Sequence, residues 1–370
     1  MQADPEPKLE RKLSELRKIL HDCESVVIGY SGGVDSAYLA CAALETLGPE
    51  RVLAVTGRSA SYPEVQYRLA MRVVRRIGLP HLELDTGELD DPNYTANPTD
   101  RCYFCKHDLY GRLLRVARER GYRTVVDGSN GDDRSDHRPG AVAAREMGVR
   151  SPLQEAGLTK AEIRELSRRH DLPTWDQPAA PCLASRIAYG VRVTRERLGR
   201  IEDAEARLRE LREWGALRVR HHRGLARLEV GPEDVVALAE PALRAGVIDA
   251  LREAGYERAA LDLEGYRRGA LNEGAGRPDL AGGAAAQTAG ARGGGAVGGR
   301  AVGAHAGRAG AAAEADLDEI AEDGIALLRP RQAEALGRLL RSRASHVARC
   351  RAAGFHYVAV ELFRTDVSLG

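Results

Sequence analysis

One short segment of the chain combines residue types that bind the phosphates of a nucleotide. Two neighbouring glycines let backbone N–H groups approach an anion with no Cβ in the way. Serines on either side can donate hydroxyl hydrogen bonds to the same anion. A carboxylate is unsuited to direct phosphate contact, but it can hold Mg²⁺ or a water bound to that metal. The segment consists of Ser31, Gly32, Gly33, Val34, Asp35 and Ser36.

The chemistry that this segment favours is release of pyrophosphate. The chain has no G-x-x-x-x-G-K-[ST] motif, so the lysine that grips a γ-phosphate in a P-loop is missing. A loop of this kind between a strand and a helix also gains the positive end of the helix dipole. The alternative is a glycine-rich turn that binds nothing, which the flanking strand and helix patterns disfavour.

Three cysteines are candidates for sulfur or metal chemistry. Cys102 and Cys105 form a C-x-x-C pair, and Cys182 lies in a loop bounded by prolines. A thiolate is a good nucleophile near neutral pH, so Cys182 is the candidate catalytic residue. Arg186 is placed to lower the pKa of Cys182 and to bind a substrate phosphate through two hydrogen bonds, and Ser185 can add another. A purely structural cysteine in this loop is the alternative.

The elements that would position these residues alternate between strand and helix over the first half of the chain. Short apolar runs typical of strands buried on both faces occur at 26–30, 52–57, 81–85 and 124–130. Segments with helical spacing lie between them. This alternation predicts a doubly wound parallel α/β sheet, with ligands bound beyond the carboxyl ends of the strands.

The pattern changes after residue 190. A long charged helix at 194–213 is followed by alternating strand-like residues at 217–230, two helices and a last strand at 258–263. We therefore expect a smaller α+β domain, in which alternation would turn one of His221 and His222 toward solvent. Glu205, on the charged helix, is a further candidate to face the active site.

Four regions follow from these patterns. Residues 1–190 form the nucleotide-binding domain with its cysteine loop, and residues 191–273 form the α+β domain for substrate or oligomer contacts. Residues 274–315 are mostly Ala and Gly, which predicts a flexible linker. Residues 316–370 regain helix and strand patterns. Within that tail, 351–362 matches 252–263 without gaps, which indicates a partial duplication or a chance similarity.

Composition limits the classes of function. Of the 370 residues, 43% are hydrophobic and 29% are charged, as in a soluble globular protein with a sizeable core. A net charge of +1 disfavours a protein whose main partner is nucleic acid. No apolar run is long enough for a membrane span, and the N-terminus lacks the apolar region of a signal peptide. We expect a cytoplasmic protein with reduced cysteines.

The phosphate-binding segment resembles the PP-loop of the ATP pyrophosphatases, which adenylylate a substrate oxygen and release pyrophosphate. The resemblance implies roles for residues after two further strands. Gly57 and Ser59 fall where this family holds adenosine. A later strand-end motif is matched by Asp127, Gly128, Ser129, Asn130, Asp132 and Asp133. Among these, Gly128 and Asn130 are expected at the nucleotide and Asp133 at Mg²⁺, a capped polar loop being the alternative.

Residues 8–273 resemble the LarE family more specifically. The resemblance rests on SGGVDS, DRCYFCK at 100–106, DGSN, PCLASRIAYG at 181–190 and LDLEGYRRGALNE at 261–273. LarE proteins are ATP-dependent sulfur transferases that help build the nickel-pincer nucleotide cofactor. The implied substrate is a pyridinium-3,5-dicarboxylate mononucleotide, whose carboxylates become thiocarboxylates. The implied partners are a sulfur donor, other proteins of the same biosynthesis, and further copies of the chain in a homo-oligomer.

The source of sulfur divides this family. In one branch a single cysteine gives up its own sulfur; in another, three cysteines bind a [4Fe–4S] cluster with one open iron. Because Cys102, Cys105 and Cys182 are all present, we favour the cluster. A sacrificial Cys182 and a zinc or structural site remain as alternatives. For the whole protein, the competing functions are a PP-loop enzyme that thiolates tRNA and a nucleotide-binding subunit without catalysis.

Overall fold

The computed structural model divides into two compact units. The first comprises Met1–Ser185 with Val193–Arg195, and the second comprises Arg186–Arg192 with Glu196–Gly370. The structure describes residues 5–135, 139–178, 180–267, 269–271, 317–322, 324–330 and 333–364. The expected linker at 274–315 lies outside these residues. No helix in the described part of the chain is both long and apolar enough to cross a bilayer.

The first unit is built on a sheet of four strands, all of them parallel. The strands are β1 (Val26–Gly29), β2 (Val52–Arg58), β3 (His81–Asp85) and β4 (Thr124–Val126), in the order β3-β2-β1-β4. β1 is the central strand, and Val26, Val27 and Ile28 are fully buried. Such continuous apolar runs form where helices cover both faces of a sheet. The prediction of a parallel sheet at these four places is confirmed.

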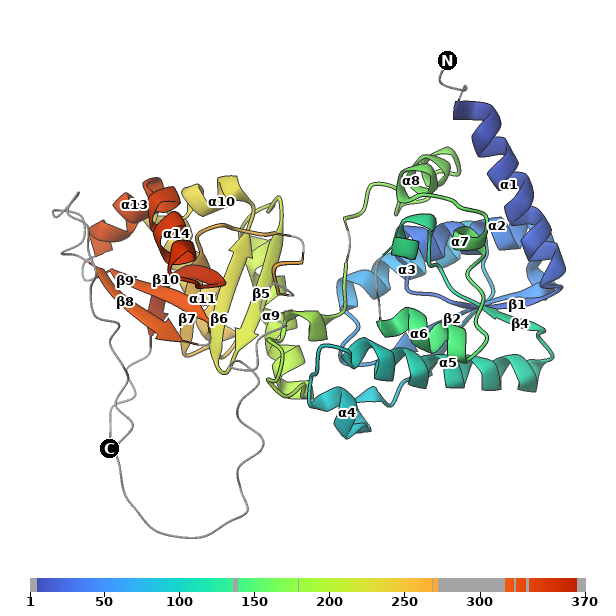
Figure 1. Cartoon of the computed structure of the whole chain (residues 1–370), viewed down its shortest axis with the longest axis horizontal. Coiled ribbons are helices and arrows are strands. Elements are labelled where there is room, and N and C mark those ends of the chain that lie inside the picture. The colour runs from blue at the N-terminus through green and yellow to red at the C-terminus, as the bar shows by residue number, and fades with distance from the viewer. Residues whose placement is uncertain are drawn as a thin grey trace, which may run out of the picture. The chain divides into compact units, whose positions relative to one another are not determined.

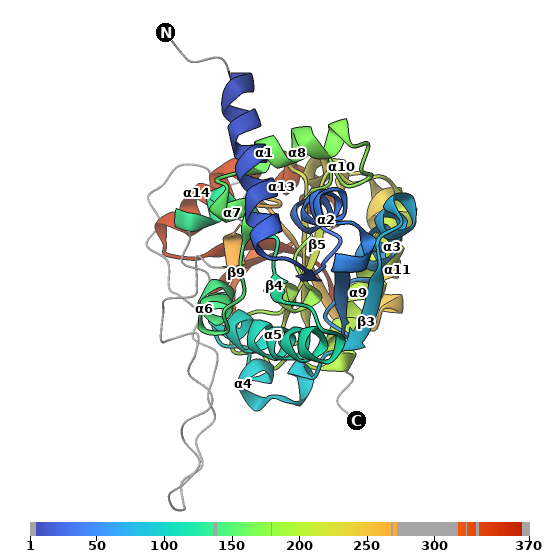
Figure 2. The same ribbon diagram turned by 90° about the vertical axis from the view of Figure 1, so that its right-hand side faces the viewer.

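Helices cover both faces of this sheet (Figures 1 and 2). α2 packs with the central strand on one face, and α5 packs with it on the other. The first face carries α1 (Pro5–Asp22), α2 (Val34–Leu47), α3 (Glu64–Ile77), α7 (Pro152–Glu155) and α8 (Lys160–Arg169). The second carries α5 (Arg101–Arg120) and α6 (Pro139–Glu146). The short α4 (Pro92–Thr95) contacts α5. The doubly wound fold predicted from sequence is confirmed.

The strand order places a ligand site at one edge of this sheet. From β1 the chain moves outward to β2 and β3, and it then returns to place β4 on the other side of β1. Ligands of such sheets bind at this reversal point, beyond the carboxyl ends of the strands on either side. The loop after β1 and the turn after β4 both contain residues that the sequence predicts at the nucleotide.

The second unit is a six-stranded sheet with helices. Its strands are β5 (Leu217–His222), β6 (Leu225–Val230), β7 (Arg258–Asp262), β8 (Leu317–Glu322), β9 (Ile325–Pro330) and β10 (Tyr357–Arg364), in the order β5-β6-β7-β10-β9-β8. Its helices are α9 (Arg195–Leu211), α10 (Pro232–Ala237), α11 (Pro241–Glu253), α13 (Ala333–Arg341) and α14 (Arg343–Ala352). One apolar core joins residues of both ends of this unit, from Ala204 to Phe363.

Two local expectations about this unit differ from the structure. The tail contributes a hairpin, β8–β9, besides the expected helix and strand, because two short strands joined by the tight turn at Gly324 leave a weak pattern. His221 and His222 are also both buried, at 2% and 4% exposure, so the expected solvent-facing histidine is wrong.

Candidate active site

The PP-loop turns tightly between β1 and α2. The Ser36 hydroxyl donates to the Gly33 carbonyl at 3.1 Å and lies 3.2 Å from the Ser31 hydroxyl oxygen. The Ser31 carbonyl accepts hydrogen bonds from the Tyr62 hydroxyl at 2.9 Å and from the Gln66 amide at 3.2 Å. The residues after β2 and at the start of α3 therefore hold the loop from outside. These bonds leave the first turn of α2 directed at the edge of the sheet.

The two glycines of the loop differ in how strictly the structure requires glycine at their positions. Gly32 has φ +64°, and a Cβ on it would lie 2.3 Å from the Ala70 Cβ, so both conformation and space require glycine there. Gly33 has φ −75°, and a Cβ would meet only the Ser31 hydroxyl at 3.5 Å. Gly33 is the residue before α2, where backbone N–H groups lack partners within the helix. The Gly33 N–H has only a long contact, 3.5 Å, with the Ser31 hydroxyl, and the positive end of the α2 dipole favours an anion at this place.

Asp35 has one engaged and one open carboxylate oxygen. Its Oδ2 pairs with the Lys160 ammonium at 2.5 Å, and its buried Oδ1 has no hydrogen-bond partner among the described residues. An oxygen of this kind fits the predicted role of holding Mg²⁺. No sequence motif marks Lys160, which is the first residue of α8 and lies between the capping-box residues Thr159 and Glu162.

The turn after β4 touches the PP-loop. A Cβ on Gly128 would lie 2.9 Å from the Ser36 backbone nitrogen, so only glycine permits this approach. The Asn130 side chain accepts from the Asp132 backbone, and Asp133 Oδ2 accepts from the Asn130 backbone at 3.0 Å. The structure therefore brings Gly128 to the loop and uses Asn130 and Asp133 to cap the turn. Their roles at ATP and Mg²⁺ stay predictions.

The segment after β2 is also closely packed. A Cβ on Gly57 would lie 2.7 Å from the Thr86 methyl group and 2.9 Å from Leu109, so the glycine lets β2 pass close to its neighbours. The Ser59 hydroxyl lies 2.7 Å from the Ser61 hydroxyl. These contacts give both residues a structural reason to be present. Their expected position beside adenosine stays a prediction.

Three thiols lie close enough to influence one another. Cys102 and Cys105 are one turn apart at the start of α5, which begins earlier than the expected residue 106. Burial, and next the charge of Cys182, raises the pKa of the Cys102 thiol. Burial and Cys182 likewise raise the pKa of Cys105, with smaller effects from Glu88 and Cys102. Three thiolates would repel each other here unless a cation joined them.

The Cys182 loop is fixed by the segment after β2. The Leu183 backbone N–H donates to the Ser61 carbonyl at 2.7 Å, and the Ser185 hydroxyl donates to the Cys182 carbonyl at 2.6 Å. Ser61 in turn donates its hydroxyl to Glu88 Oε1 at 2.9 Å. The other carboxylate oxygen of Glu88 is buried and has no hydrogen-bond partner in the described ranges. Glu88 was not recognised from sequence, because no motif marks it.

Arg186 is the first residue of the second unit, and its guanidinium is engaged there. It donates to both oxygens of Glu205, at 3.1 and 3.3 Å, and each side chain is only 3% exposed. Burial alone would raise the pKa of Glu205, but Arg186 and Arg209 hold that pKa below its usual range. Phosphate binding by Arg186 therefore stays a prediction, with Glu205 as the group that orients its guanidinium.

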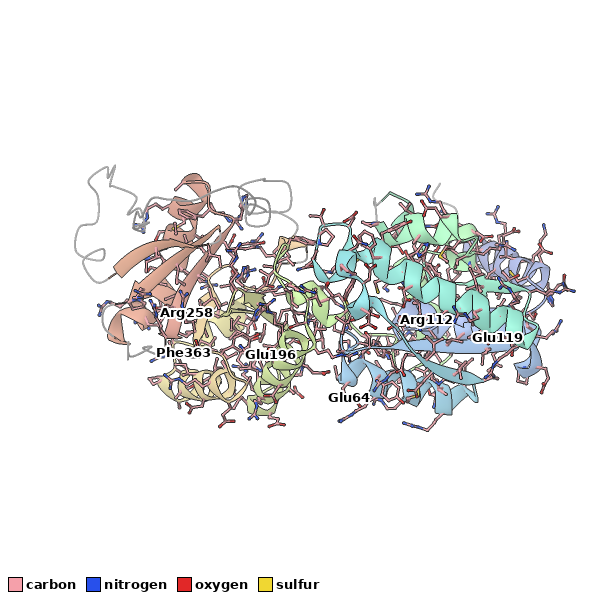
Figure 3. All side chains as sticks on the ribbon, turned by 90° about the horizontal axis from the view of Figure 1, so that it is seen from below. Glu64, Arg112, Glu119, Glu196, Arg258 and Phe363 are labelled. Atoms are coloured by element: carbon pink, nitrogen blue, oxygen red, sulfur yellow. The ribbon has the colours of Figure 1, made fainter. Side chains whose placement is uncertain are left out.

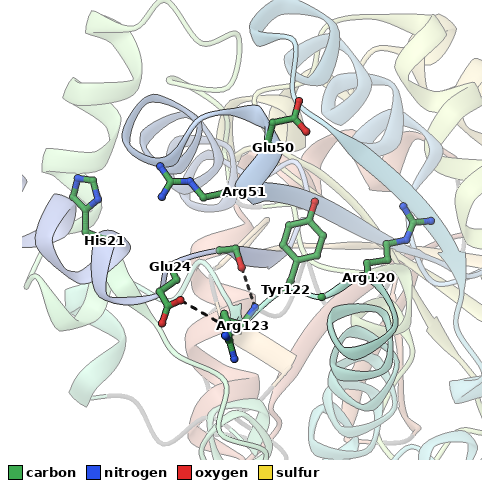
Figure 4. A pocket seen from close by; sticks show the side chains of 9 residues that line it. His21, Glu24, Glu50, Arg51, Arg120, Tyr122 and Arg123 are labelled. Atoms are coloured by element: carbon green, nitrogen blue, oxygen red, sulfur yellow. Dashed lines mark hydrogen bonds and ion pairs between the residues drawn. The ribbon is translucent and has the colours of Figure 1, made fainter.

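Two other features lie away from this edge of the sheet. Cys41, Glu45 and His170 bring three possible metal-ligand atoms within 4.8 Å of one another near the far end of α2. A hollow of about 420 Å³ lies where β1, β2 and β4 begin, and Figure 4 shows Arg51, Arg120, Tyr122 and Arg123 around it. Because the PP-loop follows the opposite end of β1, neither feature belongs to the site described above.

One family model and one solved structure match part of the chain. The NAD synthase family model matches residues 9–100, the region that contains the PP-loop. Among solved structures, NMN synthetase of Francisella tularensis matches with a TM-score of 0.37 and 19% identity. That match covers 48% of this chain and 76% of the synthetase.

Two relatives match along almost their whole length. An uncharacterized protein of Synechocystis is 42% identical over 264 residues, which cover 71% of this chain and 98% of that protein. The pyridinium-3,5-bisthiocarboxylic acid mononucleotide synthase of Lactiplantibacillus plantarum is 32% identical over 277 residues, 74% of this chain and 98% of the synthase.

Proposed function

The chain belongs to the LarE family, and on that basis we propose that it transfers sulfur to the carboxylates of a pyridinium-3,5-dicarboxylate mononucleotide at the expense of ATP. The chain is an ATP-dependent enzyme of the PP-loop type, and it uses Mg²⁺ with ATP. The observation that carries the proposal is the joint presence, in one unit, of a PP-loop with an open Asp35 oxygen and three mutually interacting thiols.

The first step is activation of a carboxylate. An oxygen of the substrate carboxylate attacks the α-phosphorus of ATP, and the bond to pyrophosphate breaks. Backbone N–H groups of Gly32 and Gly33 and the start of α2 bind the departing pyrophosphate. Asp35 would hold Mg²⁺, which supplies charge neutralisation to the phosphates, and Lys160 would add a positive charge beside them. The acyl-adenylate that results has AMP as its leaving group.

The second step is sulfur transfer. A sulfur nucleophile adds to the acyl carbon, and the bond from that carbon to the AMP oxygen breaks. The three thiols fit a [4Fe–4S] cluster, because cationic iron would stabilise the thiolate forms, which burial and next the charge of Cys182 disfavour at Cys102 and Cys105 by raising their pKa values. Cys102, Cys105 and Cys182 would hold such a cluster, and its fourth iron would supply a site for sulfide. Ser61 and Ser185 hold the Cys182 loop toward α5 while the acyl-adenylate is bound.

The sacrificial route uses Cys182 alone. Its thiolate would attack the acyl carbon and release AMP, and loss of the Cys182 α-proton would then break the carbon–sulfur bond. The product would keep the sulfur, and dehydroalanine would remain in the chain. The thiols of Cys102 and Cys105 would have no part in this route, which gives no reason for their position near Cys182, so we favour the cluster.

The test separates activation from sulfur transfer. Wild-type protein purified without oxygen is given ATP, Mg²⁺, sulfide and the mononucleotide, and pyrophosphate and thiocarboxylate are measured. Cys182→Ala should still form pyrophosphate but no thiocarboxylate. The matched control is Cys23→Ala, which replaces another cysteine of the first unit. Full thiolation by Cys182→Ala would remove this residue from the mechanism. Iron bound to the wild type and an intact Cys182 after turnover support the cluster, whereas loss of H₂S from Cys182 supports the sacrificial route.

Three further expectations accompany this function. The enzyme would work in the cytoplasm, receive sulfide from a donor and pass its product to other proteins of the same biosynthesis, and form a homo-oligomer. Native mass spectrometry of the purified chain measures the last of these directly.

A further inference from the structure

We propose that residues 317–364 are a second, diverged copy of residues 217–262, and that this copy occupies an edge of β7 on which a second chain would otherwise pair. The two segments have the same order of elements. A hairpin, two helices and a strand occur as β5, β6, α10, α11 and β7, and again as β8, β9, α13, α14 and β10. The turns before β7 and β10 each contain a glycine with positive φ, Gly255 and Gly354.

The strand registers coincide between the two segments. A shift of 100 positions carries Leu217 onto Leu317 and Leu225 onto Ile325. Residues that pair across the first hairpin correspond to residues that pair across the second. These are Leu217–Val230 with Leu317–Pro330, and His222–Leu225 with Glu322–Ile325. The parallel pairs also correspond, with a shift of 100 positions from β6 to β9 and of 99 from β7 to β10, since β6 pairs Leu225 with Arg258 and β9 pairs Ile325 with Tyr357. Chance similarity of one helix–strand segment would not reproduce two registers.

The central strand pair has the form of a two-fold interface. β7 and β10 are antiparallel. Leu261 pairs with Val360, which is the residue at the same position in the second copy. Asp262 pairs with Ala359, and the counterparts Ala260 and Glu361 also pair. In a symmetric dimer, residue i of one copy contacts residue j of the other and the reverse also holds, which is the pattern here. A bulge after Glu361 breaks this symmetry toward the end of the pair. Arg258 and Phe363 mark that end in Figure 3.

The polar side chains show how the copies have diverged. In the first copy, buried Arg227 pairs with Asp262 and with Glu229. In the second, Leu327 stands in place of Arg227, and Arg329, in place of Glu229, pairs with Glu361. Positions two apart lie on the same face of a strand. Both copies therefore have an arginine–carboxylate pair on this face, but the arginine of the second copy is two positions later in its strand. The second copy keeps the fold but lacks the first copy's Arg227.

The relatives match only part of this chain. Their lengths are spanned almost entirely by about seven tenths of this chain, so most of the remainder has no counterpart in them. A sheet that ended at β7 would expose unpaired N–H and C=O groups, which readily pair with another strand. The two-fold register indicates that a second copy of the chain was the original occupant. In this protein the tail takes that place within one chain.

Engineered disulfides test this pairing in the full chain. In an antiparallel pair, residues directly opposite each other are close enough for a disulfide. Leu261→Cys with Val360→Cys should form a crosslink within one chain upon mild oxidation. After cleavage at a protease site inserted between residues 274 and 315, this crosslink should hold the two fragments together until reduction. Leu261→Cys alone, the control, should give no crosslinked dimer. A dimer of this variant crosslinked through position 261 of both chains would overturn the proposal, because β7 would then be open to a second chain.

A second measurement needs no change in the sheet. The chain with the inserted protease site and its native β7 and β10 is cleaved and examined by size-exclusion chromatography with light scattering. The two fragments should elute together with the mass of the uncleaved protein. Separate elution of the tail fragment would show that it is not the partner of β7, and it would overturn the proposal even if the cysteine variants failed to fold.

Discussion

At the scale of single residues, the carboxylate of Asp35 combines an ion pair with Lys160 and an oxygen available to a metal ion. Its Oδ2 is bound by Lys160, while its buried Oδ1 is open. Leaving a buried carboxylate oxygen without a partner costs free energy, and a bound metal ion removes that cost. We therefore expect Asp35→Asn to lose most Mg²⁺-dependent pyrophosphate release, because a neutral amide is a poor magnesium ligand. Rates measured against Mg²⁺ concentration check this. An unchanged magnesium dependence would contradict the role given to Asp35.

Lys160 offers a second test at this scale. Its ion pair with Asp35 places its ammonium beside the PP-loop, where it can donate a charged hydrogen bond to phosphate. Such bonds contribute about 1.5–3 kcal/mol, so Lys160→Met should raise the KM for ATP by roughly tenfold or more. Lys12→Met is the matched control, because Lys12 forms an ion pair with Glu162, which lies on α8 like Lys160. Equal effects of the two substitutions would show that Lys160 only stabilises α8.

The sequence showed some of these residues and not others, for a physical reason. The PP-loop residues are contiguous, so their types and order indicate phosphate binding directly. Lys160 and Asp35 are 125 positions apart, and Glu88 is recognisable only by its burial beside Ser61 and Cys105. Contacts between distant segments leave no local pattern. The same limit hid the bidentate pairing of Arg186 with Glu205.

At the scale of elements, the PP-loop depends on one glycine more than on the other. Gly32→Ala would force a side chain into φ +64° and place its Cβ 2.3 Å from Ala70 on α3. Strain and overpacking of this kind cost about 1–3 kcal/mol each. We expect lower thermal stability together with weaker ATP binding. Gly33→Ala, whose Cβ has room, should fold as stably as the wild type. Equal melting temperatures for Gly32→Ala and wild type would contradict this account of the loop.

Element patterns were read well where they are long and periodic. The four parallel strands and the helices between them follow from apolar runs and helical spacing. The start of α5 was placed several residues late, because the polar sequence around Cys102 lacks helical periodicity. The β8–β9 hairpin was not predicted from the sequence, because its strands are short and β9 also pairs with the neighbouring β10.

At the scale of the whole molecule, two buried histidines link stability to pH. Burial, followed by nearby arginines, lowers the pKa of His221 to about 4 and that of His222 well below its usual 6.5. Both are neutral when folded, so the unfolded chain binds more protons below pH 6.5. The stability that they contribute is complete above that pH and is lost as pH falls toward 4. Denaturant midpoints from pH 7 to pH 5 should therefore fall.

The double variant His221→Gln with His222→Gln checks this pH dependence. Glutamine does not titrate, so the fall in midpoint between pH 7 and pH 5 should be shallower than in the wild type. His21→Gln, which replaces a histidine on α1 in the first unit, is the matched control. A double variant with the wild-type slope would assign the acid sensitivity to other groups.

The central claim is that ATP converts a substrate carboxylate into an acyl-adenylate. The most direct measurement uses mononucleotide labelled with ¹⁸O in its carboxylates and follows the label by mass spectrometry. The account predicts that each sulfur added leaves one ¹⁸O atom in AMP, with pyrophosphate as the other product. Thiocarboxylate formed together with unlabelled AMP, or with ADP and phosphate, would contradict it.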